Sequence, residues 1–141
     1  LSRHARALSA ARICYDHLAG RLSVALTDAL VARECIVLDA EAAEITTAGA
    51  RFFAGFGIGL ARSPRRRYCR LCLDWTERRP HIAGAIGAAI TRRCFGLGWM
   101  ERVTGSHAVV VTPTGRRGFR ERFGVETPVP AEAGTRSSSR G

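Results

Sequence analysis

The chain has 141 residues, enough for one compact domain or two small ones, which excludes a large multidomain enzyme. Its 46% hydrophobic and 24% charged residues are typical of a soluble globular protein. No run approaches the roughly 20 apolar residues of a membrane helix, so we expect no membrane contact. All 22 basic residues are arginine, and Asn and Gln are also missing. This bias is typical of a GC-rich coding sequence.

The net charge of +10 is concentrated in the second half of the chain. Residues 1–60 carry six Arg and six acidic residues, whereas residues 61–123 carry fourteen Arg and four acidic residues. A polyanion such as DNA would therefore meet the second half first. The candidate contacts to DNA phosphates are Arg65, Arg66, Arg67, Arg78, Arg79, Arg116 and Arg117. The alternative is a solvated basic face in a chain without lysine.

The five cysteines and the first residues of the chain indicate in which cellular compartment the protein is expected. Five is an odd number, and the thiols stand in apolar surroundings, which favours reduced cysteines in the cytoplasm over a disulfide framework. The chain starts at Leu1 without a signal segment, so we expect a fragment or a processed product.

An internal duplication is the most specific signal. Arg12-Ile-Cys-Tyr-Asp16 recurs as Arg70-Leu-Cys-Leu-Asp74, an offset of 58, and His17-Leu-Ala-Gly20 recurs as His81-Ile-Ala-Gly84, an offset of 64. Farther along, Ile45-Thr46, Gly49, Arg51 and Phe53 match Val111-Thr112, Gly115, Arg117 and Phe119 at an offset of 66. Three blocks in the same order predict two copies of one structural unit.

The elements of the first copy follow from its periodicity. Leucines at 18, 22, 26 and 30 predict an apolar stripe on one or two helices. Residues 35–38 are β-prone, residues 39–44 form an acidic turn region, and residues 46–56 are predicted to form a helix capped by Thr46 or Thr47.

In the second copy, the segments 99–103 and 107–111 flank Thr104-Gly-Ser106, which predicts a β-hairpin. The order helix, helix, hairpin, helix is typical of a winged helix-turn-helix. We therefore predict an α+β fold of two tandem winged-helix-like repeats with short hairpin wings. The repeats span 1–60 and 72–124, joined by a basic linker at 61–71 and followed by a disordered tail at 125–141.

The phrases Arg-Ile-Cys-Tyr-Asp-His-Leu-Ala-Gly at 12–20 and Cys-Leu-Asp-Trp-Thr-Glu-Arg-Arg-Pro-His-Ile-Ala-Gly at 72–84 carry a family resemblance. Together with the Thr-x-x-Gly-Arg-Arg-Gly stretch at 112–118, they resemble the C-terminal half of a subgroup of ArsR-like winged-helix transcriptional regulators. The resemblance implies a dimeric regulator in which this part serves effector binding and dimerisation. It also implies that a winged helix upstream recognises DNA. The segment 85–93 is poorly equipped to read bases, because it holds Gly, Ala and Ile until Arg92.

Cysteine, aspartate and histidine recur in both copies. They are candidate ligands of a metal such as zinc, or candidate reactive groups of a thiol-redox sensor. If the copies pack with pseudo-two-fold symmetry, the two sets could converge. The candidates are Cys14, Asp16, His17, Cys69, Cys72, Asp74 and His81. Against a metal, Cys-x-Asp-His matches no standard spacing. The structural alternative is a buried thiol, a capping aspartate and a hydrogen-bonded histidine in each copy, and no cofactor is certain.

A Cys-x-x-Cys pair and two tryptophans are the remaining candidate functional features. Cys69 and Cys72 form a Cys-x-x-Cys pair without the βαβ context of a thioredoxin or a second pair for zinc. Trp75 is a candidate for an effector pocket, whereas Trp99 is expected in the core. No nucleophile elbow or useful pair of carboxylates is present, so we do not expect an enzyme. A metal or thiol sensor and a stand-alone basic DNA-binding module remain the alternatives to the regulator part.

Overall fold

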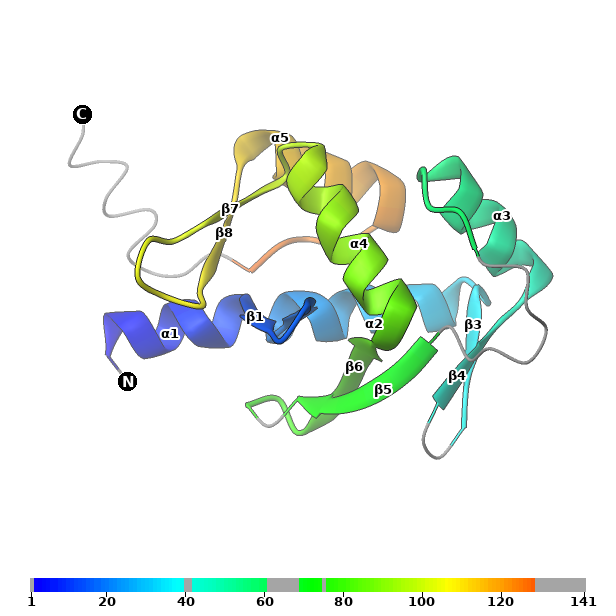
Figure 1. Ribbon diagram of the computed structural model, residues 1–141, viewed down its shortest axis with the longest axis horizontal. Coiled ribbons are helices and arrows are strands. Elements are labelled where there is room, and N and C mark those ends of the chain that lie inside the picture. Colours follow the sequence, from blue (N-terminus) through cyan, green and yellow to red (C-terminus); the bar gives the residue numbers. More distant parts are fainter. Residues whose placement is uncertain (1, 40–41, 61–68, 75, 129–141) are drawn as a thin grey trace.

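The computed structural model describes residues 2–39, 42–60, 69–74 and 76–128. In the first half the elements are α1 (Arg3–Ala10), β1 (Arg12–Cys14), β2 (His17–Ala19), α2 (Arg21–Ala32), β3 (Ile36–Leu38), β4 (Ala42–Ile45) and α3 (Thr47–Gly55). In the second half they are β5 (Cys69–Asp74), β6 (Arg79–Ala83), α4 (Gly84–Gly96), β7 (Met100–Arg102), β8 (Val109–Val111), α5 (Pro113–Gly118) and the π-helical turn η1 (Phe119–Phe123). Helices α2 and α4 lie in the middle, with hairpin β5–β6 on one side and α5 on the other (Figure 1). This mixture of helices and antiparallel strands confirms the α+β class. Across the described ranges, no helix has the length and apolarity required to span a membrane.

The order of elements differs from the winged-helix order that the sequence suggested. Helix α1 precedes the first hairpin, and from β1 onward and again from β5 onward the order is hairpin, helix, hairpin, helix. Leu18, which continues the leucine stripe of α2, lies in β2 instead of a helix. The helix begins only after Gly20, which has a φ of +89°, and Gly84 at the matching position has a φ of +68°. Glycine tolerates this left-handed backbone, and it stands at the junction of strand and helix in both copies, just before α2 and as the first residue of α4.

Two matched hydrogen bonds join the helix of each repeat to the hairpin of the other. The backbone N–H of Leu18 in β2 donates to Thr91 Oγ1 in α4, over 2.9 Å. The backbone N–H of Ile82 in β6 donates to Thr27 Oγ1 in α2, over 3.1 Å. Each threonine also donates to the carbonyl four residues earlier in its own helix. The repeats are therefore interlocked about a pseudo-two-fold axis.

Strands of the two repeats also pair with each other, in one shared sheet and at one isolated bridge. The order β3-β4-β5-β6 forms one antiparallel sheet, in which Ala42 of the first repeat pairs with Arg70 of the second. On the other side, Arg12 of β1 bridges Ala108, next to β8. Because Ala42 matches Ala108 and Arg12 matches Arg70 in the duplication, these are equivalent joints. The hairpins do not project as separate wings.

The last helix of each repeat begins in the same way. Thr46 and Thr112 are N-caps whose hydroxyls accept from the backbone N–H groups of Gly49 and Gly115. The predicted helix over 46–56 is confirmed by α3, and the hairpin predicted around 104–106 is confirmed by β7 and β8. The expected acidic turn over 39–44 was too long, because strand β4 already begins at Ala42.

One hydrophobic core runs through both repeats, with Leu22, Leu30, Phe53, Ile86 and Phe119 fully buried among its members. Trp99 is a core residue, as predicted, and packs against Phe56 and Phe119 with ring centroids 5.4 and 4.9 Å away. The predicted repeat boundaries stay predictions. Strand β5 begins at Cys69, inside the segment expected to be a linker, and Val125 is buried at the start of the expected tail.

Candidate metal centre

The first hairpins of the two repeats bring together the cysteines and histidines that the duplication had singled out. In β1–β2, Cys14 lies directly opposite His17, and in β5–β6, Cys72 lies directly opposite His81. Opposite residues of an antiparallel pair share one face of the sheet. Each hairpin therefore presents one thiol and one imidazole side by side.

The distances show that the two pairs meet. The Nε2 atoms of His17 and His81 are 3.1 Å apart. The candidate ligand atoms of Cys14, His17 and Cys72 all lie within 4.8 Å of one another. Both imidazoles are buried, whereas the two thiols are half-buried. We call Cys14, His17, Cys72 and His81 the seam cluster, because it lies between the two repeats.

Each histidine of the seam cluster has a carboxylate at its other ring nitrogen. His81 Nδ1 lies 3.0 Å from Asp74 Oδ2, and His17 Nδ1 lies 3.4 Å from Asp16 Oδ1. Asp74 is completely buried, whereas the side chain of Asp16 is 73% exposed. The two carboxylates are matched in the duplication, but the buried one has the closer contact.

The longer hairpin of the second repeat supplies extra donors to Asp74. Burial alone would raise the pKa of this carboxyl. Hydrogen bonds from Thr76, Gly20 and Glu77, with the charge of Arg12, outweigh burial and lower the pKa to about 2. Asp74 is therefore a carboxylate at neutral pH, and it ties the second repeat to Gly20 in the first.

Burial also sets the protonation of two cluster members. It lowers the pKa of His81, against the opposing effect of the Asp74 carboxylate. It raises the pKa of Cys72, an effect that the neighbouring Cys14 strengthens. At neutral pH the metal-free cluster therefore holds a neutral imidazole at His81 and a protonated thiol at Cys72.

The spacing of cysteine and histidine differs between the copies: His17 is three positions after Cys14, whereas His81 is nine positions after Cys72. The six additional residues lengthen the hairpin without changing which residues face each other. Tyr15 and Asp16 form the turn in the first copy, whereas the second adds the pairs Leu73↔Pro80 and Asp74↔Arg79 before its turn. The signal in the sequence was the even number of inserted residues, which preserves the register of a hairpin.

The remaining candidates are the arginines of the DNA-phosphate set, Trp75 and Cys69. Arg65, Arg66, Arg67 and Trp75 lie outside the described residues, as does the side chain of Cys69. Arg79 makes an exposed bidentate ion pair with Asp28, over 2.7 and 2.8 Å. Arg78 lies in the β5–β6 turn, whereas Arg116 and Arg117 lie in α5, on the opposite side of the molecule (Figure 1). The described arginines of the candidate set therefore do not gather on one surface.

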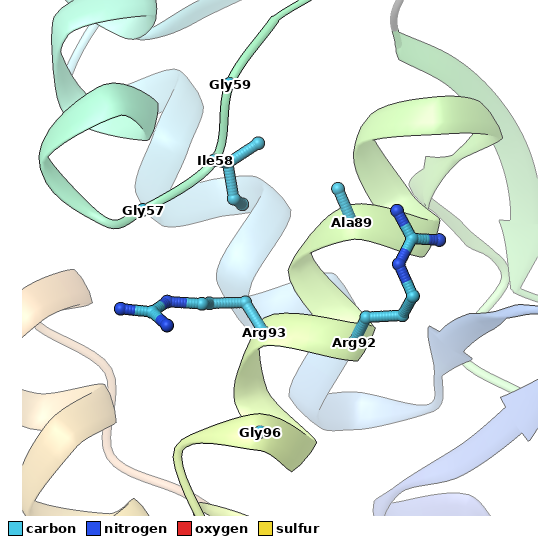
Figure 2. A pocket seen from close by; sticks show the side chains of 7 residues that line it. All are labelled: Gly57, Ile58, Gly59, Ala89, Arg92, Arg93 and Gly96. Carbon is cyan, nitrogen blue, oxygen red and sulfur yellow. The ribbon is translucent and has the colours of Figure 1, made fainter.

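A second feature is a hollow of about 310 Å³ between α4 and the segment that follows α3 (Figure 2). It is lined by Gly57, Ile58, Gly59, Ala89, Arg92, Arg93 and Gly96. Figure 2 shows the side chains of Arg92 and Arg93 pointing in different directions. Arg93 Nε donates to the carbonyl of Phe56 over 2.8 Å, so part of its guanidinium is already hydrogen-bonded to the end of α3. The hollow has positive charge but no convergent set of ligands.

Comparison with known proteins gives one informative similarity. The chain is 37% identical over 127 residues to the "Uncharacterized HTH-type transcriptional regulator YdfF" of Bacillus subtilis (strain 168). The match covers 89% of this chain and 56% of that protein, so the chain spans about half the length of the curated relative. No protein-family model matches the chain. No solved structure matches it either.

Proposed function

We propose that this chain is the C-terminal effector and dimerisation part of an ArsR-like transcriptional regulator. In this proposal a winged helix in the N-terminal part of the full-length protein recognises DNA. The observation that carries the proposal is the similarity to a helix-turn-helix regulator over 89% of this chain but 56% of that protein. We assign no catalytic activity to the chain and place it in the cytoplasm. The four cysteines whose side chains are described are free thiols, which supports that compartment.

The burial of α4 supports DNA recognition outside this part. A recognition helix must present side chains to base edges in the major groove. In α4, Ile86, Gly87, Ile90 and Thr91 are buried, and Thr91 is bonded to the hairpin of the other repeat. The exposed positions near its end hold Arg92 and Arg93, which suit phosphates better than bases.

An exposed sheet edge supports dimerisation. Strand β3 is an edge of its sheet and pairs only with β4 among the described strands. Its Val37 is 56% exposed and Leu38 is 37% exposed. Apolar side chains on an unpaired edge favour association with another chain, and we propose that a second copy covers them.

Selection from fragmented host genomic DNA tests whether DNA recognition lies outside this chain. We expect the full-length regulator to enrich a specific sequence, and the 141-residue chain to bind DNA weakly, without sequence preference and with a steep dependence on salt. Enrichment of the same sequence by the 141-residue chain would contradict the proposal and favour a stand-alone DNA-binding module.

Sedimentation of the same chain tests the dimer. We expect a dimer that the double substitution Val37→Asp, Leu38→Lys converts to a monomer. The control is Tyr15→Asp, which changes a side chain that is 99% exposed in a different hairpin. A monomeric wild-type chain, or a dimer that survives the double substitution, would contradict this part of the proposal.

A further inference from the structure

We propose that the seam cluster binds one Zn²⁺ ion through Cys14 Sγ, His17 Nε2, Cys72 Sγ and His81 Nε2. The ion would bridge the two repeats, each of which supplies one thiolate and one imidazole. This inference goes beyond the proposed regulatory role, because it stands on side-chain geometry and applies whether or not the protein acts on DNA.

The positions of the ligand atoms suit a small tetrahedral ion. A tetrahedral zinc with Zn–N bonds of about 2.0–2.1 Å puts two nitrogen ligands about 3.4 Å apart. The Nε2 atoms of His17 and His81 are already 3.1 Å apart. The sulfur atoms of Cys14 and Cys72 lie within 4.8 Å of each other and of His17. His81 joins this group through its contact with His17, so binding one ion requires the two sulfurs to close toward the pair of Nε2 atoms.

The carboxylates at the two Nδ1 atoms favour a tautomer pair whose Nε2 atoms can both bind a cation. A carboxylate can only accept a hydrogen bond, so Asp74 and Asp16 favour a proton on Nδ1 of His81 and His17. A neutral imidazole protonated at Nδ1 has a lone pair at Nε2. With both rings in this tautomer, two lone pairs face each other across 3.1 Å in a buried site. A metal ion between them turns this repulsion into two coordinate bonds.

The same carboxylates complete the surroundings of a zinc site. Histidines that bind zinc commonly donate their other N–H to a carboxylate, which fixes the ring and increases the basicity of the ligating nitrogen. Asp74 is itself held by Gly20 N, Thr76 Oγ1 and Glu77 N, so the orientation of His81 is firmly defined. Asp16 plays the equivalent part for His17 with a longer contact.

The donor types select the metal. Two thiolates and two imidazoles in a tetrahedral set favour Zn²⁺ over the hard cations Mg²⁺ and Ca²⁺, which prefer oxygen. Zinc binds cysteine as the thiolate and histidine as the neutral imidazole, so any proton that a ligand loses on binding passes to the buffer. Four protein ligands close the coordination sphere, which is typical of a structural or sensory site and leaves no position for catalysis.

The test is a Zn²⁺ titration of the reduced, metal-free 141-residue chain in competition with a chromophoric chelator. We expect one equivalent of zinc to bind. We expect Cys14→Ser and Cys72→Ser each to weaken binding by more than about 100-fold, beyond the usual loss for a partner of a ligand. Cys69→Ser is the matched control, since it removes a cysteine of the same strand and leaves the four proposed ligands; it should bind zinc like the wild type.

A second readout needs no variant, in case a substitution prevents folding. Co²⁺ bound to the wild-type chain should give the intense visible bands of tetrahedral cobalt and a thiolate-to-cobalt charge-transfer band. The proposal is overturned if no metal binds, if the charge-transfer band is absent, or if folded Cys14→Ser and Cys72→Ser bind zinc unchanged. Loss of binding in Cys69→Ser would equally overturn the proposed ligand set. If no metal binds, a proton shared by the two imidazoles is the remaining way to relieve their contact.

Discussion

His17 and His81 place their Nε2 atoms 3.1 Å apart, although they are 64 positions apart in the sequence. The same offset relates them in the duplication, so they are equivalent residues of the two repeats. Equivalent residues meet face to face only at a pseudo-two-fold axis. The seam cluster therefore lies where any ligand would contact both repeats equally, and where its binding would affect how they hold together.

The buried carboxylate of Asp74 should be important for stability. It accepts hydrogen bonds from Gly20 and Thr76 and contacts Arg12 and His81. Asp74→Ala leaves these groups without their partner, and we expect the free energy of unfolding to fall by about 3 to 5 kcal/mol. Chemical denaturation measures the change. The control is Asp28→Ala, which breaks the exposed ion pair with Arg79 and should cost less than about 1 kcal/mol. Equal effects of the two substitutions would contradict the role of Asp74.

The matched threonines Thr27 and Thr91 should contribute similarly. Thr27→Val leaves the buried N–H of Ile82 unsatisfied, and Thr91→Val does the same to Leu18. Each substitution should destabilise the fold by about 1 to 3 kcal/mol in thermal or chemical unfolding. Thr114→Val changes an exposed threonine of α5 and should leave the stability within about 0.5 kcal/mol of the wild type. A large difference between Thr27→Val and Thr91→Val would argue against equivalent joints in the two repeats.

Glycine at the start of the last helix should be required by packing. A Cβ at Gly115 would be 2.0 Å from the carbonyl oxygen of Trp99, and the matching Cβ at Gly49 would be 2.0 Å from that of Cys35. Because both contacts are with backbone, Gly115→Ala and Gly49→Ala should each cost about 1 to 3 kcal/mol or more. Gly96→Ala is the control, since its Cβ would have nothing within 4 Å at the end of α4. We expect this control to leave stability unchanged or to raise it slightly. A melting temperature unaffected by Gly115→Ala would show that the two segments lie farther apart.

Alkaline pH should weaken the fold through Cys94. Burial raises the pKa of this thiol from 9.0 to about 12. The folded state keeps the proton while the unfolded chain loses it, so the stabilisation is complete below pH 9 and is lost as the pH rises toward 12. The free energy of unfolding should fall by up to about 1.4 kcal/mol per pH unit in this range. Urea unfolding of the wild type and of Cys94→Ala as a function of pH isolates this effect. Identical pH profiles would contradict it.

Local elements were predictable where the chemistry is local. Thr46 and the apolar positions after it predicted α3, and Thr104-Gly-Ser106 predicted the β7–β8 hairpin. The hairpin β1–β2 was missed, because strands of three residues show no clear alternation and Leu18 fits the leucine stripe of α2. Glycine at 20 and again at 84 was the available sign of a break between strand and helix.

The candidate site was only partly predictable for a related reason. The duplication identified Cys14, His17, Cys72 and His81 as a matched set, but their convergence depends on pairing between the repeats. The exchange of hairpins and helices brings His17 next to His81, and no local pattern encodes that exchange. The register of the longer second hairpin had to be known before the spacing from Cys72 to His81 made sense.

The most direct test of the account is an X-ray absorption spectrum at the zinc edge of the metal-loaded 141-residue chain. Zinc in the seam cluster should show two sulfur ligands at about 2.3 Å and two imidazole nitrogens at about 2.0–2.1 Å. A shell of oxygen and nitrogen alone, or one with four sulfurs, would contradict the seam cluster as the site that joins the two repeats.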